Sequence, residues 1–348
     1  MSGSGRRRDP AWDALLSAAL FGAAAPLSKL LVERLPALQL AGLLYVGAAL
    51  AVLPFVWRRG AGPRPPLDRA NRWRLVGTIA AGGVVAPVLM VLALQISSAA
   101  SVALLLTLEV AFTAALGALV FRDPLGPLGW LGTVGIMAAA SLVAWGGGAP
   151  GLLAAVLVAV ACLGWALDNH LTALIDALPP ARTTLVKGAV AGAINLALAA
   201  WLAPGVPAAV DVAAALAIGG LCYGVSLVFY IQAAQRLGAV RAQASFATAP
   251  FWGVALAPLL FGVGLSFSAS LALAIAGIAV FLVQRDQHAH AHRHEAVEHD
   301  HWHAHDDGHH DHPHVDAAPD RGHTHPHTHK PGEHVHRHAP DLHHRHRH

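Results

Sequence analysis

The chain has 348 residues, of which 55% are hydrophobic and only 12% charged, and its mean hydropathy is +0.51. A soluble domain of this length would carry more surface charge, so the composition indicates lipid as the solvent. The net charge of +3 is small and the arginines fall in short loops, which argues against a nucleic-acid-binding surface. Cys162 and Cys222 lie in apolar runs without paired spacing, so neither a disulfide framework nor a cysteine-based zinc site is expected.

Apolar runs of about 20 residues, the length that a helix needs to cross a bilayer core, recur along the body of the chain. The first run follows Arg6-Arg7-Arg8 and has no small-residue cleavage site, so we interpret it as a membrane span and not as a signal peptide. Proline, glycine and charged residues separate the runs. Ten spans are predicted, at 12–32, 37–57, 74–94, 99–121, 128–146, 151–172, 183–203, 212–233, 239–261 and 267–284.

Basic residues fall on one side of this ten-span arrangement. With the N-terminus in the cytoplasm, the arginines between spans are almost all cytoplasmic, and only Arg34, together with Lys29 at a span end, falls outside. The asymmetry predicts that both termini are cytoplasmic. The richness in Ala, Gly, Pro and Arg and the short loops favour a multi-pass protein of the bacterial inner membrane.

The two halves of the chain align with each other at a nearly constant offset. A shift of 140 residues pairs Phe121 with Phe261, and a shift of 144 pairs Pro36 with Pro180. Five spans per half require the second half to insert upside down relative to the first, as in many secondary transporters. The predicted fold is an all-α integral membrane protein, with a cytoplasmic N-terminus at 1–11, two inverted five-helix repeats at 12–146 and 151–284, and a disordered cytoplasmic tail at 285–348.

Four segments of the body resemble the ten-helix, EamA-type branch of the drug/metabolite transporter superfamily. They are 22–29 and 99–126 in the first half, with their counterparts at 164–174 and 239–266. The resemblance covers nearly all of 11–284 and excludes the tail. It implies a transporter of small solutes and not an enzyme, with export of metabolites or amino-acid-like compounds as the expected activity.

Two features depart from the pattern of that superfamily. Its fourth and ninth spans commonly carry a Glu-Pro-like pair, whereas here the first half has Glu109-Val110 and the second Ala249-Pro250. The repeats have therefore diverged, and a symmetric site is not expected. The small multidrug members use a buried glutamate in their first helix, and this chain has no acid in the middle of its first span.

Glu109 lies about midway along the fourth predicted span, where a short carboxylate cannot reach water at either interface. An ionisable group at that depth is costly and calls for a reason. We predict a proton carrier or cation ligand facing a central cavity. The alternative is a hydrogen-bonded carboxyl group that holds helices together.

Asp168, Asn169 and His170 are consecutive polar residues in the sixth predicted span. They spread over about 200° of a helix, so they cannot all face one direction. They are candidates for the transport site and offer ligands suited to a divalent metal. A hydrated cytoplasmic helix end is the competing interpretation.

Further side chains are candidates for the polar path. Lys187 lies early in the seventh span, where we slightly favour a side chain that extends to cytoplasmic water over a counter-ion for Asp168 or Glu109. Five amides could also line the path, although amides also join helices by hydrogen bonds: Gln95, Asn195, Gln232, Gln235 and Gln243. Trp57, Trp73, Trp130 and Trp201, near span ends, are interpreted as interface anchors.

The tail contains 23 of the 24 histidines, mostly as His-x-His among acids, prolines and glycines. It has almost no apolar residues, so we expect disorder. Closely spaced imidazoles suit Zn, Ni, Co or Cu, and a pH-sensing tail is a competing interpretation. The metal-ligand candidates are His288, His290, His292, His294, His299, His301, His303, His305, His309, His310, His312, His314, His323, His325, His327 and His329.

Three functions remain open on the sequence alone. The body is either a metabolite transporter with a metal-binding tail, or a transporter of a divalent metal such as Ni, Co or Zn that uses the tail for capture or sensing, or a membrane-anchored metal sensor without transport. No phosphate-binding glycine-rich loop or hydrolase motif occurs, and no cofactor is required. The expected partners are the lipid bilayer and a small-molecule or metal-ion substrate, with no nucleic acid, and a homodimer remains an open alternative.

Overall fold

The structure is a computed structural model. It describes residues 10–31, 34–58, 67–97, 102, 105–106, 108–123, 125–144, 151–202, 205–262, 267–286, 288–294, 298–303, 323–328 and 332–338.

The body of the chain is helical, because apolar segments without access to water satisfy their backbone groups within the segment. The elements of the first half are α1 (Pro10–Lys29), α2 (Ala37–Arg58), α3 (Arg69–Thr78), η1 (Ile79–Val85), α4 (Ala86–Ile96), α6 (Leu108–Leu116), η2 (Gly117–Phe121) and α7 (Pro127–Ala144). Those of the second half are α8 (Leu152–Ala173), α9 (Pro180–Leu202), α10 (Ala209–Ile218), η3 (Gly219–Val225), α11 (Ser226–Leu237), α12 (Ala239–Phe246), α13 (Ala249–Phe261) and α14 (Phe267–Arg285).

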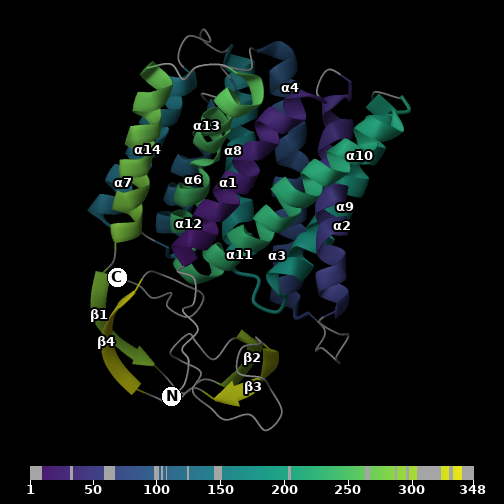
Figure 1. Ribbon diagram of the computed structural model, residues 1–348. Coiled ribbons are helices and arrows are strands. Elements are labelled where there is room, and N and C mark those ends of the chain that lie inside the picture. Colours follow the sequence, from purple (N-terminus) through teal and green to yellow (C-terminus); the bar gives the residue numbers. More distant parts are fainter. Residues whose placement is uncertain are drawn as a thin grey trace, which may run out of the picture.

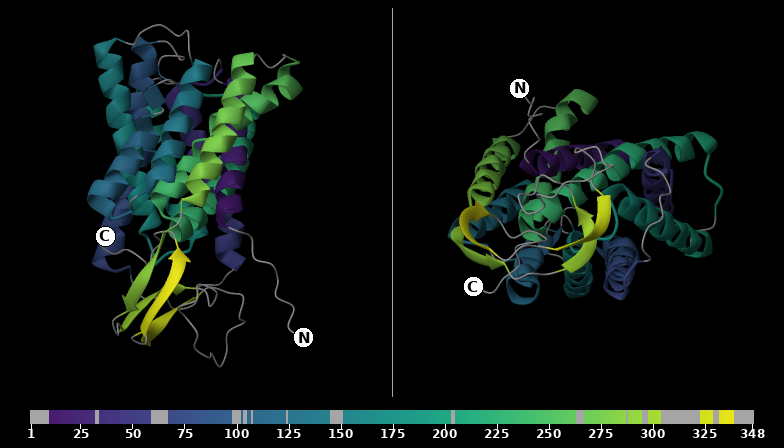
Figure 2. Two further views of the ribbon diagram at one scale, coloured as in Figure 1. Left: turned by 90° about the vertical axis from the view of Figure 1, so that its left-hand side faces the viewer. Right: turned by 90° about the horizontal axis from the view of Figure 1, so that it is seen from below.

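Six helical segments among the described residues are long and apolar enough to cross a membrane. They are Pro10–Ser28, Ala37–Trp57, Arg69–Met90, Leu152–Ala173, Pro180–Leu202 and Ala209–Leu237. Shorter apolar helices occupy Leu108–Phe121, Pro127–Leu142 and Ser270–Arg285. The helices pack side by side in one bundle, with most of their axes crossing it from end to end (Figures 1 and 2). This is the architecture of a multi-pass membrane protein.

Helices from the two halves of the chain pack against each other. α2 packs along α9, and α7 along α14. The first helix of each half lies against helices of the other half, with α1 on α11 and α13, and α8 on α4 and α6. Helix α8, which carries Asp168, Asn169 and His170, therefore packs mainly against the first half of the chain.

Small residues allow these close approaches between helices. Gly188 and Gly192 of α9 face the backbone of α2, and a Cβ added at either one would meet atoms of that helix. Gly132 of α7 lies in the same way against Ala279 and Val283 of α14. Small residues at helix contacts are typical of membrane proteins, in which packing replaces the hydrophobic driving force between helices.

Three π-helical segments interrupt the spans. η1 and η3 are the same length and lie at equivalent places in the two halves, since both ends of η3 are displaced by 140 residues from those of η1 (79 to 219 and 85 to 225). η2 continues the helix from the end of α6 as far as Phe121, and Arg122 follows in a left-handed conformation with φ 55°. π-Helical turns free backbone carbonyls from the regular ladder and occur often at functional sites.

Four segments of the tail are β-strands. β1 (His288–His294) pairs antiparallel with β4 (Gly332–His338), and β2 (Glu298–His303) pairs with β3 (His323–Thr328). Figure 1 shows both pairs beyond the end of the bundle at which α14 finishes. The alternation of histidine with other residues in these segments has the period of a strand.

Candidate functional site

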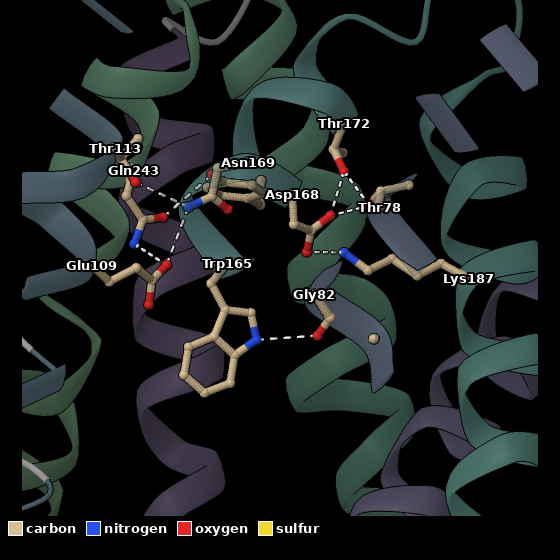
Figure 3. Close-up of polar contacts among 12 residues, drawn as sticks. Thr78, Gly82, Glu109, Thr113, Trp165, Asp168, Asn169, Thr172, Lys187 and Gln243 are labelled. Carbon is tan, nitrogen blue, oxygen red and sulfur yellow. Dashed lines mark hydrogen bonds and ion pairs between the residues drawn. The ribbon is translucent and has the colours of Figure 1, made fainter. Parts of the chain in front are cut away.

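Helix α8 brings three consecutive polar side chains into the interior of the bundle. Asp168, Asn169 and His170 are all buried, with exposed fractions of 6%, 8% and 0%. As the helical geometry requires, Asp168 and Asn169 face different neighbours (Figure 3). The alternative of a hydrated helix end does not describe these side chains, because protein surrounds each of them.

Glu109 is the centre of the first polar group. Its Oε1 accepts hydrogen bonds from Nδ2 of Asn169 at 3.1 Å and from Nε2 of Gln243 at 2.7 Å. The amide of Gln243 in turn accepts a hydrogen bond from the Tyr230 hydroxyl at 3.2 Å. Glu109 is itself half-buried, and its Oε2 has no hydrogen-bond partner among the described residues. One carboxylate therefore joins α6 of the first half to α8 and α12 of the second and leaves one oxygen available.

Asp168 is the centre of the second polar group. Its Oδ1 accepts hydrogen bonds from the hydroxyls of Thr172, at 2.9 Å, and of Thr78. Its Oδ2 pairs with Nζ of Lys187 at 2.5 Å. The carboxylate is thus fully partnered by residues of α3, α8 and α9.

The preferred interpretation of Lys187 as a side chain that reaches cytoplasmic water is wrong. Only 7% of its side chain is exposed, and its ammonium group ends on Asp168. In the structure, Lys187 is instead the counter-ion of Asp168. A buried carboxylate needs a nearby cation, and this requirement outweighs the reach of the lysine toward water.

The π-helix η1 supplies backbone acceptors beside these two groups. Nε1 of Trp165 donates to the Gly82 carbonyl at 3.1 Å, and Nδ2 of Asn195 donates to the Gly83 carbonyl at 3.0 Å. Gly82 also lies against the Asp168 carboxylate so closely that a Cβ would overlap it. Figure 3 shows the Trp165 indole between the Glu109 group and the Asp168 group.

The side chain of His170 is fully buried, with an exposed fraction of 0%. A backbone carbonyl only accepts, so Nε2 of the ring donates to the Thr113 carbonyl at 2.9 Å, which assigns the proton to that nitrogen. The ring stacks on Phe121 with 4.4 Å between centroids and 3° between planes. These contacts describe a packed histidine at the junction of α6 and η2.

Two of the glutamine candidates have different outcomes. Nε2 of Gln235 donates to the Ile175 carbonyl at 2.7 Å, so this amide joins the end of α11 to the turn after α8. Gln95 lies on α4, and its side chain falls outside the described residues. The hydrogen bond of Gln235 is therefore not to Glu109, whereas Gln243 donates to Glu109 directly.

Aromatic side chains extend from the Glu109 group toward α1 and α2. Phe246 lies 4.9 Å from Tyr230 and 4.9 Å from Phe21, and Tyr223 lies 4.9 Å from Phe21 and 5.9 Å from Tyr45, all between ring centroids. Tyr230 is buried, whereas the other four rings are half-buried. Sequence reasoning did not find this group, because its members come from five elements and no spacing along the chain connects them.

A second charged cluster lies where α14 ends, and sequence reasoning used its arginine only to orient the protein. Arg241 pairs with Asp286 at 3.3 Å and with Asp123 at 3.8 Å, and it also donates to the Asp286 carbonyl. Asp123 accepts from the Val240 amide at 3.0 Å, and Asp286 from the Gly126 amide at 2.7 Å. The exposed fractions of Arg241, Asp123 and Asp286 are 2%, 0% and 7%.

Some of the metal-ligand candidates of the tail lie in strands that the structure describes, and the others lie outside the described residues. Backbone positions are described for those in β1, β2 and β3, whereas His305, His309, His310, His312, His314 and His329 lie outside the described residues. Among the side chains that the structure describes, no group of three or more His, Cys, Asp or Glu residues is placed to hold a metal ion.

Together, the helical bundle and its buried polar groups define a multi-pass membrane protein with ionisable side chains held between its two halves. Within that class, residues 12–145 match the EamA-like transporter family, of the drug/metabolite transporter superfamily. This confirms the resemblance drawn from the sequence.

A solved structure described only as "Crystal structure of protein" shares the fold. The similarity has a TM-score of 0.69 at 16% sequence identity and covers 79% of this chain and 97% of the other. The uncovered fifth is comparable in size to the histidine-rich tail. No curated protein matches the chain.

Proposed function

We propose that the chain is a secondary transporter of small organic solutes, built from ten spans in two inverted five-helix repeats at 12–146 and 151–284. The equal 140-residue displacement of both ends of η1 and η3 supports the repeat. The exchange of first helices between halves, α1 into the second and α8 into the first, supports the pseudo-symmetry. Transporters of this design bind substrate near the middle of the membrane, between the repeats.

In the proposed orientation both termini are cytoplasmic and the membrane is the bacterial inner membrane. The retention of arginines on one side of the ten spans supports this arrangement. Arg241, Arg74 and Arg285 would then be cytoplasmic, whereas Arg34, which pairs with Asp211 at 3.2 Å, would lie at the outer end.

The observation that carries the proposal is the position of Glu109 between the halves. Its Oε1 accepts hydrogen bonds from two elements of the second half, and both bonds are stronger to a deprotonated carboxylate than to a protonated carboxyl group. Protonation at Oε2 would neutralise the group and weaken both bonds. Glu109 is thus the group in which binding of a proton or cation would alter the contact between repeats.

A small organic cation or zwitterion fits the side chains around Glu109. The carboxylate attracts a positive group, and the half-buried rings of Phe21, Tyr223 and Phe246, which connect to the Glu109 group through Tyr230, offer apolar surface. Metabolite or amino-acid-like export, implied by the family, is compatible with such a site. The Asp168–Lys187 pair is the second contributor that we propose.

The experiment is solute flux in proteoliposomes that contain the full chain under an imposed proton gradient. The flux of amino acids, organic cations, Zn, Ni and Co is measured for wild type, for Glu109→Gln and for Asp68→Asn. We expect gradient-driven organic flux in wild type and in the exposed-site control Asp68→Asn, and a loss of at least tenfold in Glu109→Gln. Glutamine preserves the shape of the side chain, so a folding defect is not the expected cause.

The outcomes separate the three candidate functions. Flux of Zn, Ni or Co without organic flux would replace the proposal by metal transport. No flux of any solute would favour a membrane-anchored metal-binding protein. Organic flux that persists in Glu109→Gln would remove Glu109 from the mechanism. Independently of the body, we propose that the tail binds Zn, Ni, Co or Cu, which the density of histidines supports.

A further inference from the structure

A chain of hydrogen bonds leads from Tyr230 on α11 through Gln243 on α12 to Glu109 on α6. The Tyr230 hydroxyl donates to Oε1 of Gln243 at 3.2 Å, and Nε2 of Gln243 donates to Oε1 of Glu109 at 2.7 Å. Tyr230 and Gln243 are both buried. We call these three side chains the amide relay. Both of its donors point toward the carboxylate, which is the arrangement that suits a negative charge on Glu109.

Two members of the amide relay are able to exchange the roles of donor and acceptor. A hydroxyl group both donates and accepts, and a primary amide carries an accepting carbonyl beside a donating NH₂ group. Turning the Gln243 amide over would therefore keep both of its hydrogen bonds, provided that Glu109 donates and Tyr230 accepts. A carboxyl group donates only when it is protonated. The two directions of the relay thus correspond to the two protonation states of Glu109.

The other titratable side chains around Glu109 already have partners. Helices α7, α8 and α12 pack against α6, and α7 carries no titratable side chain. Those on α8 and α12 are Cys162, Asp168, His170 and Arg241. Asp168 pairs with Lys187 of α9, and Arg241 pairs with two aspartates. The Cys162 thiol and the His170 ring donate to backbone carbonyls. Oε2 of Glu109 is therefore an oxygen to which a proton adds without breaking an ion pair.

Tyr230 also belongs to the aromatic group that the proposed solute would contact. Its ring lies 4.9 Å from that of Phe246, and Phe246 lies 4.9 Å from Phe21, between centroids. Any reorientation of the Tyr230 hydroxyl and ring therefore acts on Phe246 by direct contact. The amide relay is thus a continuous connection between the carboxylate of Glu109 and the apolar surface beside it.

We propose that Tyr230 and Gln243 are positioning residues that transmit the protonation state of Glu109 to the aromatic group. When Oε2 takes up a proton, a half-turn of the carboxyl group sets the new O–H against Gln243. The amide then turns over, and the Tyr230 hydroxyl accepts from Nε2 instead of donating to Oε1. The proton stays on Glu109 throughout. This inference rests on the proposed function, in which Glu109 binds a proton or cation, and specifies how the solute site responds.

The test is infrared difference spectroscopy of the purified full-length chain between pH 5 and pH 9. Glu109→Gln identifies the carboxyl C=O band of Glu109. Tyr230→Phe identifies the phenolic C–O band of Tyr230, whose frequency depends on whether the hydroxyl donates or accepts. We expect both bands to change with the same pH midpoint in wild type. Glu109→Gln should abolish the change in the tyrosine band, whereas Tyr230→Phe should retain the carboxyl band.

Two buried amides provide a matched comparison. Gln243→Leu removes the middle of the relay, so the pH-dependent change of the Tyr230 band should be lost. Gln235→Leu removes a buried amide of α11 that donates to the Ile175 carbonyl, and the change should persist. Each variant loses one amide, so a general effect of packing would alter both alike. Equal effects of the two variants on the Tyr230 band would contradict the relay.

The outcomes separate the relay from the proposed function. A Glu109 carboxyl band without a change in the Tyr230 band would overturn the relay, while the role of Glu109 in transport stands. Absence of a Glu109 carboxyl band over this pH range would overturn the relay together with proton binding at Glu109. Coupled changes of both bands in a protein that carries no solute in the flux experiment would support the relay and reject the proposed function.

Discussion

At the scale of single residues, the Asp168–Lys187 pair shows how a membrane interior accommodates charge. Each charge alone would be costly at that depth. The pair is completed by hydrogen bonds from Thr78 and Thr172, so Asp168 has partners for both of its oxygens. Removing one partner leaves the other charge uncompensated, and removing both avoids that cost.

We therefore predict that Lys187→Met destabilises the protein by about 3–5 kcal/mol, because it leaves the Asp168 carboxylate buried without a cation. Asp168→Asn combined with Lys187→Met should recover most of the loss. Unfolding of the purified protein in detergent, measured for both single variants and the double variant, gives the coupling energy. A double variant that loses as much as the sum of the single variants would show that the pair is not coupled.

The directions of polar side chains are the part of the site that the sequence could not predict. Glu109, Asp168, Asn169 and Lys187 are unusual by residue type alone, and this is why they stood out. Their partners depend on the rotation of each helix about its axis, which packing decides. Hence the contact of Gln243 with Glu109, and the cluster around Arg241, have no signal in local spacing.

At the scale of elements, the start of α3 depends on a capping residue outside the apolar span. Asp68 is exposed, and its carboxylate accepts the backbone N–H of Asn71 at 2.9 Å. This hydrogen bond, which favours the charged form, lowers the pKa of Asp68 below its usual range. Asn71 in turn donates to Asp176 at 2.7 Å and ties the helix start to the turn after α8.

Asp68→Ala should cost about 1 kcal/mol at neutral pH, the usual loss for a missing N-cap. Because the folded-state pKa is lowered, the contribution of the charged cap is present above the unfolded pKa near 4 and disappears as the pH falls through the lower folded value. Unfolding free energies at pH 7 and at pH 3 check this, with Asp68→Asn as the control that retains an acceptor without a charge. An equal loss in Asp68→Ala and Asp68→Asn at pH 7 would contradict the capping role.

Helix positions were accessible from the sequence because length and hydropathy determine them. The predicted spans at 37–57 and 151–172 differ by one residue at most from the ends of α2 and α8. The π-helical turns were not predicted, since Gly82-Gly83 alone does not distinguish a π-turn from close packing.

At the scale of the whole molecule, the cluster of Arg241, Asp123 and Asp286 joins the two halves at the end where α14 finishes. One arginine compensates two buried carboxylates, and these also hold the amides of Val240 and Gly126. For the halves to separate at this end, the whole cluster must open. We therefore expect it to act as the closing contact of the proposed transport cycle.

Arg241→Gln should favour the open arrangement at this end, because it removes the cation that pairs with both Asp123 and Asp286. In an Ala244→Cys background, whose parent residue on α12 is 0% exposed, Arg241→Gln should raise the rate of labelling by a membrane-impermeant maleimide severalfold in inside-out vesicles. Arg285→Gln, at an exposed arginine on the end of α14, is the matched control. Equal labelling rates in the two variants would show that the cluster does not govern access.

The arrangement of the four tail strands along the chain also has a thermodynamic consequence. β2 and β3 enclose residues 304–322, and both lie within the segment 295–331 that β1 and β4 enclose. Once the inner pair has formed, the outer pair closes a far shorter effective loop, which reduces its entropic cost by roughly 1 kcal/mol, or about fivefold in its pairing equilibrium. The two pairs therefore form cooperatively, from the inside outward, and β1, the strand that follows α14, pairs last.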